Sequence, residues 1–284
     1  MLERALRSIK THFTNDVEVI VCDDNSESKK IEEALNIVET IKNESGLNIL
    51  FLRNERAKGV SGARNYAVKK SSAEWLLFLD DDDEFTEEYV DFIFSKITHE
   101  FHYDLLWSNI YISKQIGTTD VIVKKIFISQ TTEEIYRDLI SIGLGYGVLI
   151  RKSAFIDNGM FNEKLKVAED TNLFFEFIKH NNSIIHASIF GVCINEHREE
   201  KLSKNYEYHA KHNIFRNLYR KNILILKKYD LLYTAFCSWV VSVYKQNEMY
   251  TKALIFCFEF LIKNFFSTAV FMQFKNEIKN LHVR

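Results

Sequence analysis

The segment EWLLFLDDDDEF (Glu74–Phe85) places four consecutive aspartates directly after an apolar run. A short apolar run predicts a buried β-strand over Glu74–Leu79, with Asp80–Asp83 in the turn that follows it. Four adjacent carboxylates repel one another unless a cation or a set of hydrogen-bond donors compensates. Mg²⁺ and Mn²⁺ bind carboxylate oxygens and often share phosphate oxygens of a substrate. The segment therefore indicates either a metal site or a solvated turn whose aspartates cap a helix.

The first half of the chain alternates short apolar runs with helical patterns, whereas the middle section is less regular. Upstream, strands are predicted at Val17–Cys22 and Asn48–Leu52, and helices at Lys29–Lys42 and about Ser61–Lys70. This alternation predicts a parallel sheet with helices on both faces, and ligands bind such sheets at the carboxyl ends of the strands. The elements predicted downstream are helices at Glu87–Ile97, Thr132–Ile142 and Glu169–His180, and strands at Asp104–Ser113, Thr119–Ile128, Gly145–Ile150 and Ser183–Ile194.

The last part of the chain, from Tyr206 onward, has a helical pattern rich in Tyr, Phe, Lys and Asn. We therefore predict two parts, a domain over residues 1–204 and a helical C-terminal extension over residues 205–284. The extension either packs on the first domain or recognises an acceptor, a protein partner or a membrane surface. Its aromatic and lysine-rich composition suits an interfacial face.

Composition narrows the class of protein. The 284 residues are 46% apolar, which is enough for a buried core, and the formal net charge of −2 argues against nucleic acid as the main ligand. The four cysteines are far apart and form no CxxC pair, which predicts reduced thiols rather than disulfides or a zinc site. The N-terminus has no apolar signal-peptide region, and the apolar runs are shorter than the roughly 18 residues of a spanning helix. We expect a cytoplasmic protein, with attachment to the inner face of the plasma membrane left open.

Two polar segments precede the acidic turn. Asp23 and Asp24 directly follow the first predicted strand, and KGVSGARN (Lys58–Asn65) precedes a helix. Its glycines allow close backbone approach, Ser61 can cap the helix, and a helix N-terminus presents N–H groups to an anion. Arg64 offers a fork suited to a diphosphate or a base carbonyl. The alternative is an ordinary turn. Neither GxGxxG nor a P-loop lysine signature is present, which speaks against a dinucleotide dehydrogenase or a P-loop NTPase.

Two polar segments follow the acidic turn. GMFNEKLKVAED (Gly159–Asp170) ends in a Glu–Asp pair at the start of a predicted helix. The helix dipole favours an ionised Asp170, which could act as a general base, although an exposed acidic pair at a helix start is also common. His197 follows the strand that ends near Ile194. A neutral imidazole could be a third metal ligand there, or the histidine could be structural or merely exposed.

Taken in order, four motifs resemble those of the family 2 glycosyltransferases, which have the GT-A fold. The similarity covers about residues 1 to 204 and implies an α/β fold with a Rossmann-like, nucleotide-sugar-binding sheet. The first motif, EVIVCDDNS (Glu18–Ser26), resembles the family's strand with the uridine-binding aspartates, and KGVSGARN resembles its diphosphate and base loop. The third, EWLLFLDDDDEF, resembles the strand with the metal-binding DxD. The fourth, GMFNEKLKVAED, resembles the segment that ends in the catalytic Glu–Asp pair.

The resemblance implies a role for each site residue. Asp170 would be the catalytic base and Glu169 its support. Asp24 would contact the uracil, Arg64 the base or diphosphate, and Asp80 the ribose or the metal shell. The implied donor-binding residues are Asp23, Asp24, Gly59, Arg64, Asp80 and Asp82, and the implied ligands of Mn²⁺ or Mg²⁺ are Asp82, Asp83 as the alternative, and His197.

The implied reaction is a single displacement with inversion at the anomeric carbon. Asp170 would take the proton of an acceptor hydroxyl while the metal stabilises the departing nucleoside diphosphate. The expected donor is a UDP-sugar and the acceptor a glycan or lipid-linked glycan of a bacterial surface polysaccharide. A haloacid-dehalogenase-type phosphatase also has DxD after a strand, but that family expects Thr or Val where Glu84 stands.

The beginning of the chain departs from the family pattern. Family members normally start with an apolar strand that ends in a Pro-x-Tyr-Asn type segment, whereas Met1–Leu6 corresponds to the helix that follows this strand. We therefore expect unpaired edges on the neighbouring strands and an incomplete base pocket. Two alternatives follow, a truncated gene product or a catalytically impaired protein that still binds nucleotide sugars.

Overall fold

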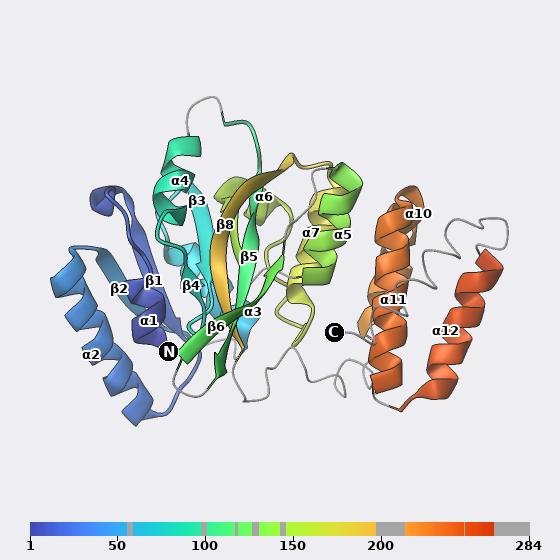
Figure 1. The fold of residues 1–284 in the computed structure, drawn as a ribbon, viewed down its shortest axis with the longest axis horizontal. Helices are drawn as coiled ribbons and strands as arrows, with labels where there is room; N and C mark the ends of the chain where they lie inside the picture. Colours follow the sequence, from blue (N-terminus) through green and yellow to red (C-terminus); the bar gives the residue numbers. More distant parts are fainter. Residues whose placement is uncertain are drawn as a thin grey trace.

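The computed structural model describes residues 1–55, 59–97, 101–116, 119–126, 131–142, 146–196, 214–246 and 248–263. These residues form two β-sheets with helices around them, followed by a group of C-terminal helices (Figure 1). Among the described residues, no helix is both long and apolar enough to cross a membrane.

The first sheet is a parallel pair, β1 (Glu18–Asp23) and β2 (Asn48–Arg53). It packs against α1 (Leu2–Arg7) and α2 (Ser28–Ser45), as Figure 1 shows. Gly46 ends α2 in the left-handed conformation, with a φ of 71° that L side chains rarely adopt. The buried residues of this small core are Leu6, Val38, Ile41, Leu47 and Ile49.

The second sheet is mixed rather than parallel. Its order is β3, β7, β5, β8 and β4, with β6 paired to β5. Only β5 and β8 run parallel, and the other pairs are antiparallel. The strands are β3 (Trp75–Leu79), β4 (Glu84–Phe85), β5 (Leu105–Ile116), β6 (Thr119–Ile126), β7 (Tyr146–Arg151) and β8 (Ile184–Glu196). The sequence predicted a parallel sheet for the strands up to Leu79. This is confirmed for β1 and β2 but wrong for β3, which pairs antiparallel with β7, because apolar periodicity identifies a strand but not the direction of its neighbour.

The two sheets leave strand edges without partners. Among the described residues, β1 pairs only with β2, and β3 lies at the end of the second sheet with β7 as its one neighbour. The unpaired edges expected from the sequence are therefore present in the described part of the chain. Backbone N–H and C=O groups along such an edge are available for a further strand.

The second sheet has an apolar core on each face. Successive residues of β5 alternate between them, since Leu105 and Trp107 join one core while Leu106 and Ile110 join the other. Helix α4 (Tyr89–Lys96) covers the second of these cores. The other core contains residues of α5 (Thr132–Ile142), α6 (Lys152–Asp157) and α7 (Glu169–Lys179). Helix α6 and the two-residue strand β4 were not predicted, because both are too short to show a period.

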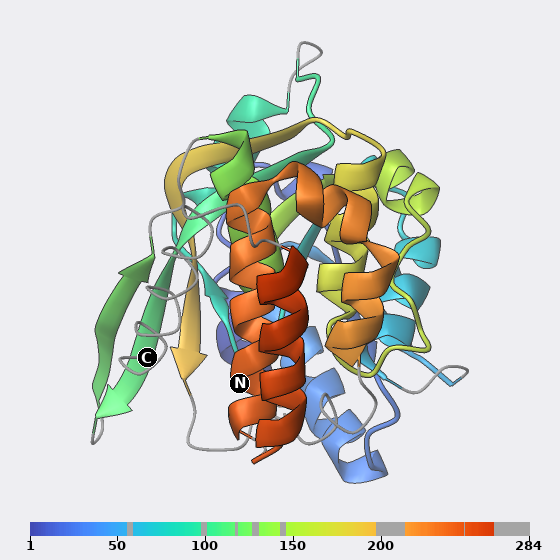
Figure 2. The same ribbon diagram turned by 90° about the vertical axis from the view of Figure 1, so that its right-hand side faces the viewer.

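The C-terminal helices lie on the far side of α5 and α7 from the sheet (Figure 1). They are α9 (Ile214–Lys221), α10 (Ile223–Lys228), α11 (Asp230–Gln246) and α12 (Tyr250–Lys263). Helix α11 packs on α5, and α12 packs on α11 (Figure 2). The described extension therefore packs on the first domain, which was one of the two alternatives. The boundary predicted near residue 204 lies outside the described residues and stays a prediction.

Candidate active site around the acidic turn

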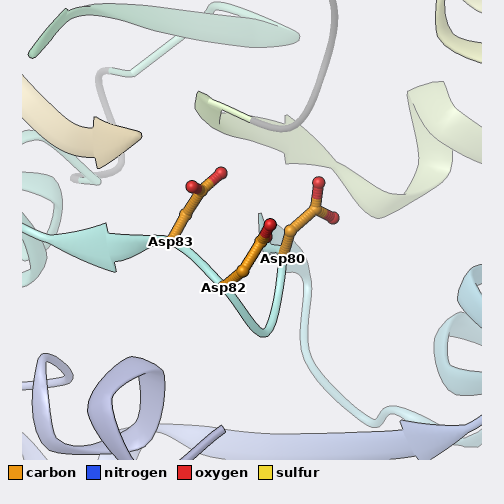
Figure 3. Close-up of side chains that lie close together, drawn as sticks. All are labelled: Asp80, Asp82 and Asp83. Carbon is orange, nitrogen blue, oxygen red and sulfur yellow. The ribbon is translucent and has the colours of Figure 1, made fainter. Parts of the chain in front are cut away.

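The acidic turn connects β3 to β4, and the N–H of Asp83 donates to the Asp80 carbonyl oxygen over 3.2 Å. Asp80, Asp82 and Asp83 each offer a carboxylate oxygen within 4.8 Å of the other two. Figure 3 shows their three side chains on the same side of the turn. Asp83 is 2% exposed, Asp80 and Asp82 are half-buried, and Asp81 is exposed outside this group. The sequence shows only that the four aspartates are adjacent. In the structure, the carboxylates of three of them lie close together.

The guanidinium of Arg64 joins the acidic turn to the start of α7. It is held over the end of β3 by α3 (Val60–Lys70). Its Nη2 donates to Asp80 Oδ1 and its Nη1 to Glu169 Oε1, the latter over 3.2 Å. The guanidinium also lies 5.6 Å from the centre of the Phe161 ring. Arg64 thus bridges two predicted functional segments, and its predicted contact with a donor stays a prediction.

Glu169 and Asp170 form the first turn of α7, as predicted. Ala168, just before them, has a φ of 59°, a conformation unusual for a residue with a side chain. The Glu169 side chain is 12% exposed. Burial, together with the charge of Asp170, raises the pKa of Glu169 to about 7, although Arg64 acts in the opposite direction. Glu169 can therefore change its protonation state near neutral pH.

Asp23 and Asp24 lie at the end of β1 and fasten the loop before α3. Asp24 accepts the Gly59 N–H over 2.7 Å and the Asn54 side-chain amide over 3.3 Å. Gly59 has a φ of 124°, which favours glycine. Asp23 accepts the Ser26 N–H over 3.2 Å. These bonds bring β1, the glycine loop and α3 together, which the sequence had suggested only from their order.

The predicted helix cap by Ser61 is wrong, and the predicted metal ligand His197 lies beyond β8, where the structure does not test it. Ser61 does not cap α3, because the cap position is Gly59 and no side-chain cap bond is present there. The Ser61 hydroxyl is buried and has no hydrogen-bond partner among the described residues. Lys58 and His197 lie outside the described residues, so the predicted role of His197 as a metal ligand stays a prediction.

Asn195 is a site residue that the sequence did not reveal. Its N–H donates to Asp83 Oδ1 over 3.0 Å, and its side-chain amide donates to the Asp82 carbonyl oxygen over 2.9 Å. It lies two residues before His197 at the end of a predicted strand, which is the one signal that could have drawn attention to it. Nothing in the local pattern predicts contact with a turn more than 100 residues earlier.

Comparison with known proteins identifies the class. Residues 1–159, more than half of the 284, match the sequence profile of Glycosyl transferase family 2. The chain belongs to this family.

Its fold is GT-A, as in Staphylococcus aureus TarS, whose 1–349 fragment was solved in complex with UDP-GlcNAc. That structure aligns with a TM-score of 0.59 and 24% identity, over 72% of this chain and 57% of that one. GalNAc-T7, solved with UDP, GalNAc and Mn²⁺, aligns with a TM-score of 0.50 and 17% identity, over 70% of this chain and 41% of that one.

Two curated relatives act on lipid-linked substrates according to their names. A GalNAc(5)-diNAcBac-PP-undecaprenol beta-1,3-glucosyltransferase of Campylobacter jejuni is 25% identical over 66% of this chain and 58% of its own length. The Escherichia coli UDP-Glc:alpha-D-GlcNAc-diphosphoundecaprenol beta-1,3-glucosyltransferase WfaP is 30% identical over 37% of this chain and 39% of its own length. The matches span less than two thirds of either relative.

Proposed function

We propose that this protein transfers a sugar from a UDP-sugar to a hydroxyl of a lipid-linked glycan during bacterial surface polysaccharide synthesis. One observation carries the proposal: in a family 2 chain, Arg64 joins the converging aspartates of the acidic turn to the Glu169–Asp170 pair. In the proposal, the acidic turn holds the counter-ion of the diphosphate, and the Glu169–Asp170 pair supplies the base. The printed substrates of the relatives support the acceptor class.

The acidic turn suits Mn²⁺ or Mg²⁺ by its chemistry. Three carboxylate oxygens within 4.8 Å of one another are hard ligands that these ions prefer, and no thiolate or imidazole is among them. Asp82 and Asp83 would hold the ion, with Asp80 beside them and His197 as a further candidate. A divalent ion bound there would stabilise the negative charge that develops on the diphosphate.

The end of β1 and the start of α3 suit the nucleotide. Asp24 holds Gly59 next to the first turn of α3, where N–H groups and the helix dipole favour an anion. The buried Ser61 hydroxyl in that turn has no partner among the described residues, so a phosphate oxygen could accept its hydrogen bond. Asp23 and Asp24 would contact the uridine.

Asp170 is the proposed base. It would accept the proton of the acceptor hydroxyl as that oxygen attacks the anomeric carbon, while the bond to UDP breaks on the opposite face and the configuration inverts. Glu169 would keep Arg64 in place beside it. Asp170→Asn should therefore retain UDP binding and lose transfer, whereas a loss of UDP binding would contradict its role as the base.

The decisive experiment measures UDP release from a panel of UDP-sugars, with a lipid-linked acceptor and with and without Mn²⁺. Wild type should require the metal, and Asp82→Ala should lose most of the metal-stimulated rate. Unchanged metal dependence in Asp82→Ala would remove the metal-ligand assignment. The alternative raised by the sequence is a nucleotide-sugar-binding protein with impaired catalysis. UDP binding without transfer to any acceptor would support that candidate.

We also propose that α12 contacts the membrane in which a lipid-linked acceptor resides. Its outward face carries Tyr250, Leu254, Ile255 and Phe258, which are 57%, 69%, 48% and 64% exposed. Within residues 250–258 these four large apolar side chains form an exposed face, where an ordinary surface helix is mainly polar. An apolar face on a basic segment suits an anionic lipid surface. In this proposal the protein works at the inner face of the plasma membrane.

A further inference from the structure

Asn195 contacts three consecutive residues of the polypeptide at the acidic turn. Its N–H donates to Asp83 Oδ1 over 3.0 Å, and its Nδ2 donates both to the Asp82 carbonyl oxygen over 2.9 Å and to Glu84 Oε1 over 3.1 Å. Asn195 is 4% exposed. The pairing of β4 with β8, in which Glu84 lies opposite Cys193, brings these groups together. Both donors of one side-chain amide are therefore used at this turn.

Arg4 of α1 supplies a positive charge next to Glu84 and the Asp82 carbonyl oxygen. Its Nε lies 2.9 Å from Glu84 Oε1, and its Nη2 donates to the Asp82 carbonyl oxygen over 3.4 Å. Glu84 is thus paired with a cation on one side and with the neutral amide of Asn195 on the other. A second cation in place of the amide would repel a divalent ion at Asp82 and Asp83, whereas an amide orients the turn without adding charge.

We infer that Asn195 is a positioning residue that holds Asp82 and Asp83 in place for a divalent cation. The inference rests on the proposed function, because it takes the acidic turn to be the metal site. Neighbouring carboxylates repel one another in the absence of the ion, so the turn needs an anchor to keep them together. Hydrogen bonds that orient metal ligands typically change metal affinity by roughly 10- to 100-fold.

The test measures Mn²⁺ binding directly, by the loss of the free-ion EPR signal, with and without UDP. Asn195→Ala removes both side-chain donors, and we expect the dissociation constant for Mn²⁺ to rise about tenfold or more. Asn195→Asp keeps the size of the side chain, removes the donors and adds a negative charge. An added charge alone would tighten Mn²⁺ binding, so weaker binding by this variant as well would identify orientation as the cause.

The matched control is Asn158→Ala. Asn158 is also buried, at 5% exposure, and its amide bonds to the Ala154 carbonyl oxygen over 2.7 Å and to Asn182 over 2.9 Å, away from the acidic turn. It should lower the melting temperature without changing Mn²⁺ affinity. Wild-type Mn²⁺ affinity in Asn195→Ala would overturn the inference. Failure of the wild-type protein to bind Mn²⁺ even with UDP would instead contradict the metal site of the proposed function, and the role of Asn195 with it.

Discussion

Arg64 is the residue on which the electrostatics of the candidate site depend. Its guanidinium is 15% exposed and pairs with Asp80 and Glu169, which come from two different segments. A cation held between two carboxylates away from water interacts more strongly with each than an exposed one would. Substitution of Arg64 would leave the carboxylates of Asp80 and Glu169 without their buried cation. Its effect should therefore reach both the acidic turn and the start of α7.

Replacement of Arg64 by glutamine should lower kcat/KM for sugar transfer by roughly 100-fold, because the acidic turn and α7 lose their common partner. It should also raise the pKa of Glu169 further, because Arg64 favours the charged carboxylate. The pH profile of kcat/KM measures both effects. Arg151→Gln, which removes a guanidinium paired with Glu74 instead, is the control. An Arg64→Gln profile that matches wild type in height and midpoint would contradict the bridge.

Glu169 should also make stability depend on pH. Its pKa of about 7 in the folded protein exceeds the ordinary value of 4.5, so between these values the folded state binds more protons than the unfolded state. This contribution to stability is present in full below pH 4.5 and is lost as the pH rises through 7. The change is on the order of 1–3 kcal/mol. Urea unfolding from pH 4.5 to 8 measures it, and Glu169→Gln should flatten this slope. An equal slope in the variant would show that other groups cause it.

Strand β8 connects the acidic turn to the rest of the second sheet. It runs parallel to β5 along most of its length and antiparallel to β4, which follows the turn. The Thr86 N–H donates to the Gly191 carbonyl oxygen over 2.9 Å just beyond β4. The turn is therefore positioned by a strand that lies more than 100 residues later in the chain.

Gly191 allows β8 to lie against α4. A Cβ atom added there would lie 2.6 Å from the Tyr89 ring and closer still to the Ser108 hydroxyl, distances that real Cβ atoms do not show. Tyr89 is fully buried, so its ring cannot move aside without disturbing the core. Gly191→Ala should therefore lower the free energy of unfolding by about 1–3 kcal/mol. Urea denaturation measures this, and wild-type stability in the variant would show that the core has room to adjust.

Charged residues are distributed unevenly along the chain. Residues 205–284 contain 12 Lys and Arg against 5 Asp and Glu, whereas residues 1–204 contain 25 against 34. The overall charge of −2 conceals this asymmetry. The exposed apolar face of α12 belongs to the basic part, at the end of the molecule away from the first sheet (Figure 1).

A charge introduced into that face should weaken membrane binding. Leu254→Glu should reduce cosedimentation with vesicles containing phosphatidylglycerol by roughly tenfold, because it places a carboxylate against both the apolar boundary and the anionic lipid. Leu35→Glu, at a leucine of α2 that is 44% exposed, is the matched control. Wild-type vesicle binding by Leu254→Glu would contradict the proposal. A wild-type dimer that Leu254→Glu dissociates would identify the face as a contact between two copies.

Local sequence patterns were enough to predict most elements and to identify the residues of the candidate site. The apolar run before Asp80–Asp83, the glycines before α3 and the Glu–Asp pair at the start of α7 are all local signals, and the structure places each on the expected element. The order of these motifs also indicated the family, which the comparison confirms. The direction of the strands in the second sheet, the bridge made by Arg64 and the contact of Asn195 with the turn were decided only by the tertiary structure. Each of these depends on which distant segments pack side by side, and periodicity records only whether a residue is buried, not what lies against it.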